Sequence, residues 1–201
     1  MAIKVANNQS MTGITALPSA ISSGAWTLLS TQTASSSSTL SFTSGLDSTY
    51  DVYCFKFINI HPATDNTHFS VGFRDGSTDY DATKTTSLFY ARHKEDGSAT
   101  ALSYDTGNDI AQGTGFQYLY FDTGADNDQA ANGYMYLYNP ASTTYVKHFM
   151  ARCTSSGEND WVYDTYCAGY CNVTAAIDAV QFKMSSGNID AGDICLYGIT
   201  T

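Results

Sequence analysis

The sequence predicts an all-β protein: a single antiparallel β-sandwich of jelly-roll type with an extended N-terminal arm. β-branched and aromatic residues are abundant, whereas few stretches of Ala, Leu, Glu or Lys repeat with the period of a helix. Short apolar runs are separated by loops rich in Gly, Asp, Asn and Ser, as in antiparallel sheets. A chain of 201 residues, 43% of them hydrophobic, can bury one core of this kind.

The start of the chain differs in composition from the rest, so we assign residues 1–24 to a docking arm and residues 25–201 to the sandwich domain. The arm is polar, rich in small residues and interrupted by Gly13, Pro18 and Gly24. Its apolar side chains would gain nothing in solvent, so we expect them to dock onto a neighbouring subunit or shell protein. They are Ile3, Val5, Met11, Ile14, Leu17 and Ile21.

Strands of the domain are expected where β-branched and aromatic residues cluster between turn residues. The clearest covers residues 50–60, which are apolar on both alternating faces except at Lys56 and Asn59, as in the centre of a sandwich. It is expected to stop at His61 and Pro62, because proline has no N–H to donate to a ladder. Other strands are expected at residues 26–33, 39–43, 69–74, 87–93, 116–121, 134–138 and 145–151.

The C-terminal part of the domain predicts two more strands. Residues 179–184 alternate between apolar and polar side chains, which indicates one buried and one wet face. Turn residues at 185–188 and 190–193 separate this strand from a closing strand at 194–199. The resulting roughly nine or ten short strands, without crossover helices, favour an antiparallel sandwich over a parallel α/β sheet.

The charge and the apolar runs of the chain argue against nucleic-acid binding and a membrane-spanning helix. A net charge of -10 and only nine scattered basic residues argue against nucleic-acid binding, which needs clustered Lys and Arg. No stretch approaches the roughly 20 apolar residues of a membrane-spanning helix. Residues 1–8 lack the basic and apolar segments of a secretory signal, so we expect synthesis in a cytoplasm.

Two kinds of metal site can be considered, and neither motif is complete. The five cysteines are expected to be buried free thiols of a reducing compartment, and the pair Cys167 and Cys171 lacks the two further ligands of a zinc site. Oxygen ligands for calcium cluster at residues 75–81 and 122–128, but neither run matches an EF-hand loop. We therefore predict no metal and no cofactor.

Catalytic motifs are also weak. There is no Gly-x-Ser-x-Gly elbow to place a serine nucleophile near one of the four histidines. A glycosidase needs two carboxylates facing one cleft, but Glu95 and Glu158 both lie in loops rich in Gly and Asp, which favours solvated loop charge. A glycan-cleaving enzyme is therefore the weakest of the functions considered, and we predict that the chain is not an enzyme.

Tyrosine is unusually frequent, with 15 in the chain. Tyr134, Tyr136 and Tyr138 are spaced so that they line one face of a single strand. Such a face is either a subunit interface, in which amphipathic rings pack together, or a platform on which glycans stack. The interface is the commoner use, so we predict that these three tyrosines lie in an assembly interface.

Several runs of sequence carry a likeness to a known family. They are AIK (2–4), LPSAI (17–21), LSTQTASS (29–36), FKFINIHPATDN (55–66), AIDAVQFKMSSGNIDAG (176–192) and LYGI (196–199). Together they resemble small virion structural proteins of marine tailed phages, especially cyanophages, over nearly the whole chain. The cysteines, above all Cys167 and Cys171, depart from the pattern.

The resemblance implies a non-enzymatic virion structural protein, made in the host cytoplasm, that decorates or cements the capsid or forms part of a fibre. It brings no catalytic residue. The implied partners are other virion proteins and further copies of this chain, as a homotrimer, because virion β-sandwiches of this kind often gather around three-fold axes. The alternative is a receptor-binding module of a tail fibre that grips a host-surface glycan.

Overall fold

The computed structural model describes residues 25–200 as an all-β fold, in which every ladder between named strands is antiparallel. The docking arm predicted for residues 1–24 lies outside the described residues and stays a prediction, as do its contacts at Ile3, Val5, Ile14, Leu17 and Ile21. In chain order the described strands are β1 (Trp26–Thr33), β2 (Leu40–Phe42), β3 (Val52–Pro62), β4 (Thr67–Arg74), β5 (Lys84–Lys94), β6 (Thr100–Tyr104), β7 (Gln117–Thr123), β8 (Ala131–Tyr138), β9 (Lys147–Gly157), β10 (Trp161–Cys171), β11 (Ala179–Met184) and β12 (Ile189–Ile199).

Every strand predicted from the sequence is present, although several run further than expected. The turn predicted at residues 190–193 is wrong, because these residues belong to β12. The pairing of β12 with β3 shifts register on either side of Ala191, and Gly192 has a positive φ of 113°. These irregular residues form a bulge inside β12. The strand predicted over residues 50–60 is observed as β3 from Val52 to Pro62, so it ends at the predicted stop at His61 and Pro62, where proline is tolerated as the last residue.

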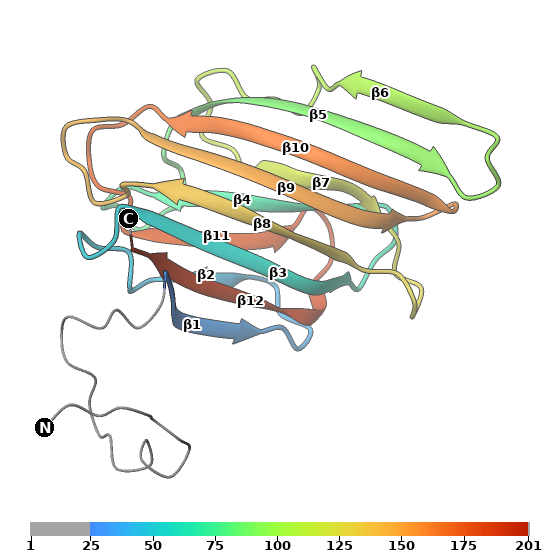
Figure 1. The fold of residues 1–201 in the computed structure, drawn as a ribbon, viewed down its shortest axis with the longest axis horizontal. Helices are drawn as coiled ribbons and strands as arrows, with labels where there is room; N and C mark the ends of the chain where they lie inside the picture. The colour runs from blue at the N-terminus through green and yellow to red at the C-terminus, as the bar shows by residue number, and fades with distance from the viewer. Residues whose placement is uncertain (1–24, 201) are drawn as a thin grey trace, which may run out of the picture.

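The strands form one branched sheet with two rows. The front row runs β1-β12-β3-β8-β9-β10-β5-β6, and the back row runs β2-β11-β4-β7 behind it (Figure 1). The rows are hydrogen-bonded to each other through β7 and β9, where Thr123 pairs with Gly157. This junction curves the sheet back on itself, so that it is nearly barrel-shaped.

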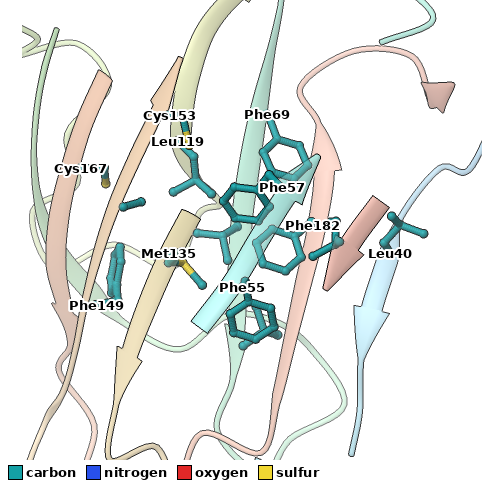
Figure 2. Close-up of a cluster of buried hydrophobic side chains, with 14 of the residues drawn as sticks. Leu40, Phe55, Phe57, Phe69, Leu119, Met135, Phe149, Cys153, Cys167 and Phe182 are labelled. Carbon is teal, nitrogen blue, oxygen red and sulfur yellow. The ribbon is translucent and has the colours of Figure 1, made fainter. Parts of the chain in front are cut away.

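The core fills the space between the two rows. The rings of Phe55 and Phe57 on β3 each lie 5.3 Å from the ring of Phe182 on β11, and that of Phe73 on β4 lies 4.8 Å from Phe149 on β9. These strands are not hydrogen-bonded neighbours, so the rings pack across the interior (Figure 2). All five side chains are buried, and each stabilises the fold by about 1.5–3 kcal/mol of hydrophobic transfer energy.

Strand β9 shows how the front row separates core from surface. Its side chains alternate strictly from Lys147, which is buried, to Thr154, which is exposed. Residues such as Phe149 and Cys153 enter the core, whereas Met150 and its same-face neighbours point outward. The front row therefore has an outer face, and the candidate site lies on it.

Candidate functional site

The outer face of the front row carries most of the exposed large apolar side chains in the described part of the chain. Strand pairing places them in rows across the strands. One such row runs Lys56, Tyr134, Arg152, Tyr166, Phe89 and Tyr104, from β3 to β6. A second runs Leu28, Tyr197, Cys54, Tyr136 and Met150, from β1 to β9. We define the aromatic face by Trp26, Leu28, Phe89, Tyr104, Tyr134, Tyr136, Tyr138, Met150, Tyr166 and Tyr197.

The three tyrosines singled out in the sequence lie together on this face. Tyr134, Tyr136 and Tyr138 project from the outer side of β8, with ring centroids 5.4 Å and 6.3 Å apart along the strand. Met135 and Leu137, between them, are fully buried. The prediction that the three tyrosines line one face of this strand is confirmed. Their role in an assembly interface stays a prediction.

One end of the aromatic face is a cluster of rings around a lysine. The ring of Trp26 lies 6.2 Å from that of Tyr136 and 5.7 Å from that of Tyr197. Lys56 holds its Nζ 4.7 Å from the Trp26 ring centroid and 5.1 Å from that of Tyr197. Such cation–π contacts contribute about 0.5–1 kcal/mol at exposed sites. Lys56, a charged residue of a largely apolar strand, is thus accommodated by the aromatic side chains around it.

The other half of the face contains a clamped arginine. Arg152 on β9 donates from Nε and Nη2 to the two carboxylate oxygens of Asp164 on β10, at 3.0 Å and 2.8 Å. Its guanidinium also lies 4.8 Å from the Tyr166 ring centroid, and the Tyr166 ring stacks on Phe89 at 4.9 Å. The hydrogen bonds that Arg152 donates to Asp164 raise the pKa of Arg152. The guanidinium is therefore charged and held in one orientation, which suits it to recognise a further group.

Two shallow depressions hollow the outer face. One, of about 440 Å³, lies over β8, β9 and β10, and a second, of about 530 Å³, lies over β9, β10 and β5. The first is lined by Asn132, Gly133, Tyr134, Arg152, Cys153, Thr154 and Asp164. The second is lined by Thr85, Thr86, Ser87, His148, Phe149, Met150, Ala168, Gly169 and Tyr170. The first thus joins an aromatic ring to a fixed set of polar groups.

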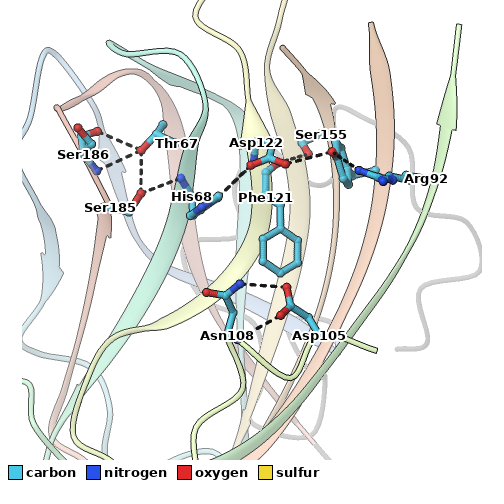
Figure 3. A network of polar contacts seen from close by, with 11 residues as sticks. Thr67, His68, Arg92, Asp105, Asn108, Phe121, Asp122, Ser155, Ser185 and Ser186 are labelled. Carbon is cyan, nitrogen blue, oxygen red and sulfur yellow. Dashed lines mark hydrogen bonds and ion pairs between the residues drawn. The ribbon is translucent and has the colours of Figure 1, made fainter. Parts of the chain in front are cut away.

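A polar network forms a second cluster, at the junction of the two rows (Figure 3). Tyr163 Oη donates to Asp122 Oδ2 at 3.1 Å, and the backbone N–H of Asp122 donates to His68 Nδ1 at 3.2 Å. Burial lowers the pKa of His68, which favours the neutral ring. Because Nδ1 accepts the hydrogen bond from Asp122, the proton of the neutral ring lies on Nε2. Ser155 Oγ donates to the backbone oxygen of Phe121 at 3.1 Å.

These contacts tie β7 and β4 of the back row to β9 and β10 of the front row. A polar cavity of about 210 Å³ beside them is lined by residues including Arg92, Asp122 and Glu158. Arg92 stacks on Trp161 at 4.5 Å and donates to Tyr163 Oη at 3.4 Å. The Asp122 carboxylate already accepts a hydrogen bond from Tyr163, which indicates a structural role for the cluster. We call the hydrogen-bonded residues His68, Asp122, Ser155 and Tyr163 the seam between the two rows.

The residues of the metal motifs considered in the sequence lie in the core, in β7 and in loops. Within residues 25–200, no group of three or more His, Cys, Asp or Glu side chains is arranged to hold a metal ion. Cys167 and Cys171 both point from β10 into the core, and all five cysteines are buried and free, as predicted. Of the acidic runs, Asp122 belongs to the seam, and the backbone oxygen of Asp126 hydrogen-bonds to the His61 ring.

Sequence reasoning missed most of the aromatic face. Trp26, Tyr197, Tyr166 and Phe89 lie on four different strands, and only the pairing register brings them beside Tyr136 and Tyr134. A tyrosine repeat within one strand is visible in a sequence, but a row across strands is not.

Over the described residues no helix has the length and apolar character needed to cross a membrane.

The chain was also compared with known proteins. A scan against protein-family models gives no match, and a search of curated proteins gives none either.

Proposed function

We propose that this chain is a non-enzymatic virion structural protein, a jelly-roll building block that works by packing its aromatic face against copies of itself. Following the sequence resemblance, the assembly is a homotrimer that decorates or cements the capsid of a tailed phage, or forms part of its fibre. Its other partners are neighbouring virion proteins. No step of this function requires a cofactor or a reactive side chain.

The strand order supports the jelly-roll assignment. A jelly roll winds eight strands into two facing four-stranded rows by two Greek keys. The order β1-β12-β3-β8 opposite β2-β11-β4-β7 is the order that such a winding would give. The remaining strands are two excursions, β5–β6 and β9–β10, which extend the front row beyond β8. Jelly rolls are common in viral capsid proteins and in lectins, so the fold agrees with the proposal without deciding it.

The observation that carries the proposal is the exposed aromatic face. Leu28 and Met150 are each 54% exposed and Tyr104 is 52% exposed, although all three are large apolar side chains on one sheet surface. Contiguous apolar patches are uncommon on proteins that remain monomeric and mark sites of association. Tyrosine and tryptophan favour such contacts, because their rings pack while their polar atoms find hydrogen-bond partners.

Charge on the face also favours contact between copies. The chain carries a net charge of -10, so copies repel one another over most surfaces. Lys56 and Arg152 place positive charge on the aromatic face, where Asp164 offsets only part of it. Copies that meet through this face therefore feel less repulsion than copies that meet elsewhere.

The association is tested by light scattering on the purified chain and on Tyr136→Glu, which places a carboxylate in the centre of the face. We expect the unmodified chain to form an oligomer, and the Tyr136→Glu variant to be monomeric while keeping its thermal unfolding transition. Tyr145→Glu is the matched control, since Tyr145 is 71% exposed but lies in the loop between β8 and β9. A monomeric unmodified chain, or equal association of both variants, contradicts the proposal.

The virion assignment has its own test. Mass spectrometry of particles purified from a culture that produces this chain is expected to find it in the particles, in fixed ratio to the major capsid protein. Hundreds of copies indicate the head, and a few indicate the tail. Recovery of the chain only in the soluble fraction contradicts a structural role in the virion.

A further inference from the structure

We infer that the depression over β8, β9 and β10 is a binding site for a neutral saccharide. This inference goes beyond the proposed assembly function and concerns the end of the aromatic face at which Tyr134 borders Arg152, Thr154 and Asp164. Asn132, at the depression, is six positions along β8 from Tyr138, or roughly 20 Å for an extended strand. Tyr138 thus lies outside the depression, whereas Tyr134 belongs both to the depression and to the aromatic face, with its ring 5.4 Å from that of Tyr136.

The size and walls of the depression suit one or two sugar rings. Its volume of about 440 Å³ lies in the range of small-molecule sites, which is roughly 300–1,000 Å³. Sugar rings have an apolar face of C–H groups and a rim of hydroxyls, so they are recognised by an aromatic ring combined with fixed polar groups. Tyr134, 39% exposed, supplies the aromatic wall.

The polar groups of the depression are held in place before any ligand arrives. Arg152 uses Nε and Nη2 to bind Asp164, which leaves N–H groups on Nη1 and Nη2 free to donate. Asp164 keeps lone pairs that accept from hydroxyls. An arginine and a carboxylate presented side by side can bind adjacent hydroxyls, one as donor and one as acceptor. Stacking on Tyr166 fixes the plane of the guanidinium.

Asn132 adds a donor with a defined orientation. Its Oδ1 accepts the backbone N–H of Asn59 at 2.8 Å, so the amide group is anchored to β3. The Nδ2 group is then free to donate toward the depression. Thr154, an exposed residue of β9, contributes a hydroxyl on the same side. Donors and acceptors are therefore both present around one aromatic ring.

The charges of the site select a neutral sugar over an acidic one. Asp164 neutralises Arg152 within the site, so no net positive charge remains to attract a carboxylate or a sulfate. The net charge of -10 on the whole chain also repels anionic glycans at long range. Asp164 is the one carboxylate lining the depression among the described residues, which makes the site one of binding and not of hydrolysis.

The test is an array of immobilised oligosaccharides, both neutral ones built from glucose, galactose or mannose and anionic ones carrying uronic acid or sulfate. The unmodified chain is expected to bind one or more neutral members. Titration calorimetry with the free oligosaccharide that gives the strongest signal then measures the affinity. Tyr134→Ala and Asp164→Asn are each expected to weaken it at least about tenfold, because each removes one kind of recognition.

Two further variants keep the result interpretable if those two fold poorly. Thr154→Phe fills the depression with a ring on an exposed strand position and is expected to block binding. Tyr138→Ala, on the same face of β8 outside the depression, is the control and is expected to bind as the unmodified chain does. Failure of the unmodified chain to bind any neutral glycan, selective binding of anionic glycans, or undiminished binding by Thr154→Phe overturns the inference.

Light scattering on the same variants separates this inference from the proposed assembly. Thr154→Phe is expected to lose saccharide binding while it still associates, and Tyr136→Glu to show the reverse. A chain that associates but binds no neutral saccharide overturns the inference alone. A chain that binds saccharide through Tyr134 as a monomer overturns the proposed assembly alone.

Discussion

Burial controls the chemistry of the cysteine side chains. Desolvation raises the pKa of Cys54 and of Cys171 to about 12, and it raises the pKa of Cys153 and Cys167 as well. A thiol reacts as its thiolate, so these buried groups are inert at neutral pH. Cys167 and Cys171, whose spacing suggested a metal site, are core residues four positions apart on the inner side of β10.

The raised thiol pKa values predict a loss of stability at high pH. In the unfolded chain a cysteine ionises near its ordinary pKa of 9.0, whereas Cys54 stays protonated in the fold until about pH 12. Between these values the unfolded state binds fewer protons, so the free energy of unfolding falls as pH rises, by up to about 1.4 kcal/mol per pH unit for each thiol. Urea unfolding measured from pH 8 to 11 checks this slope.

The control for this pH dependence is Cys54→Ala, which removes one of the contributing thiols. Its unfolding free energy is expected to fall less steeply above pH 9 than that of the unmodified chain, because tyrosines and the other thiols still titrate. Identical slopes for the two proteins would show that Cys54 does not stay protonated in the fold.

Some buried residues could not be predicted from the sequence, and the lysines show why. Lys84 and Lys147 are fully buried, although lysine is normally a surface residue. The Nζ of Lys84 donates to the backbone oxygen of Gly115 at 2.7 Å, and that of Lys147 to Val173 at 2.9 Å. These carbonyls lie in loops that are distant in the sequence. The hydrogen bonds that offset the cost of burying the two ammonium groups therefore exist only once the chain has folded.

At the scale of elements, β7 depends on a narrow seam. The backbone pairing of β7 with the front row is at Thr123 and Gly157. A Cβ on Gly157 would lie 2.8 Å from Cε2 of Tyr163 and 2.9 Å from the backbone oxygen of Asp122, so only glycine allows this close approach. The Tyr163 hydroxyl then closes the seam by its hydrogen bond to Asp122.

Tyr163→Phe tests the contribution of this seam. The substitution removes the donor to Asp122 and leaves a partly buried carboxylate without it, so we expect the free energy of unfolding to fall by about 1–3 kcal/mol. Amide hydrogen exchange in β7 should accelerate more than exchange in β3. Tyr170→Phe is the comparison, since Tyr170 lies on the outer face of the same strand. A loss no larger than that of Tyr170→Phe would contradict the proposed role of the seam.

The strands that could be predicted from the sequence and those that could not differ in composition. The first strand was located with its observed bounds, and the central strand with nearly its observed bounds, because their residues are largely β-branched, aromatic or apolar. Strands β6 and β10 were missed: β6 is a short polar edge strand, and β10 is diluted by Asp164, Ala168 and Gly169. Their strand state depends on pairing with β5 and β9, which local patterns do not report.

At the scale of the whole molecule, two strand pairs make the front row of the sheet wider than the back row. Strands β5–β6 and β9–β10 lengthen the front row from four strands to eight, while the back row keeps four. The added strands carry Tyr166 and Phe89 of the aromatic face, and they carry Arg152 and Asp164, which line the depression beside it. The all-β fold was predictable from composition, but this widened face depends on the order in which distant strands pair.

Radical footprinting of the outer face tests the proposed association most directly. Hydroxyl radicals oxidise exposed side chains, and mass spectrometry can follow Met150, 54% exposed, and Tyr145, 71% exposed, in one digest. Between a dilute and a concentrated sample, labelling of Met150 should drop severalfold while that of Tyr145 stays constant. Unchanged labelling of Met150 in a concentrated sample that light scattering shows to be oligomeric would contradict packing through the aromatic face.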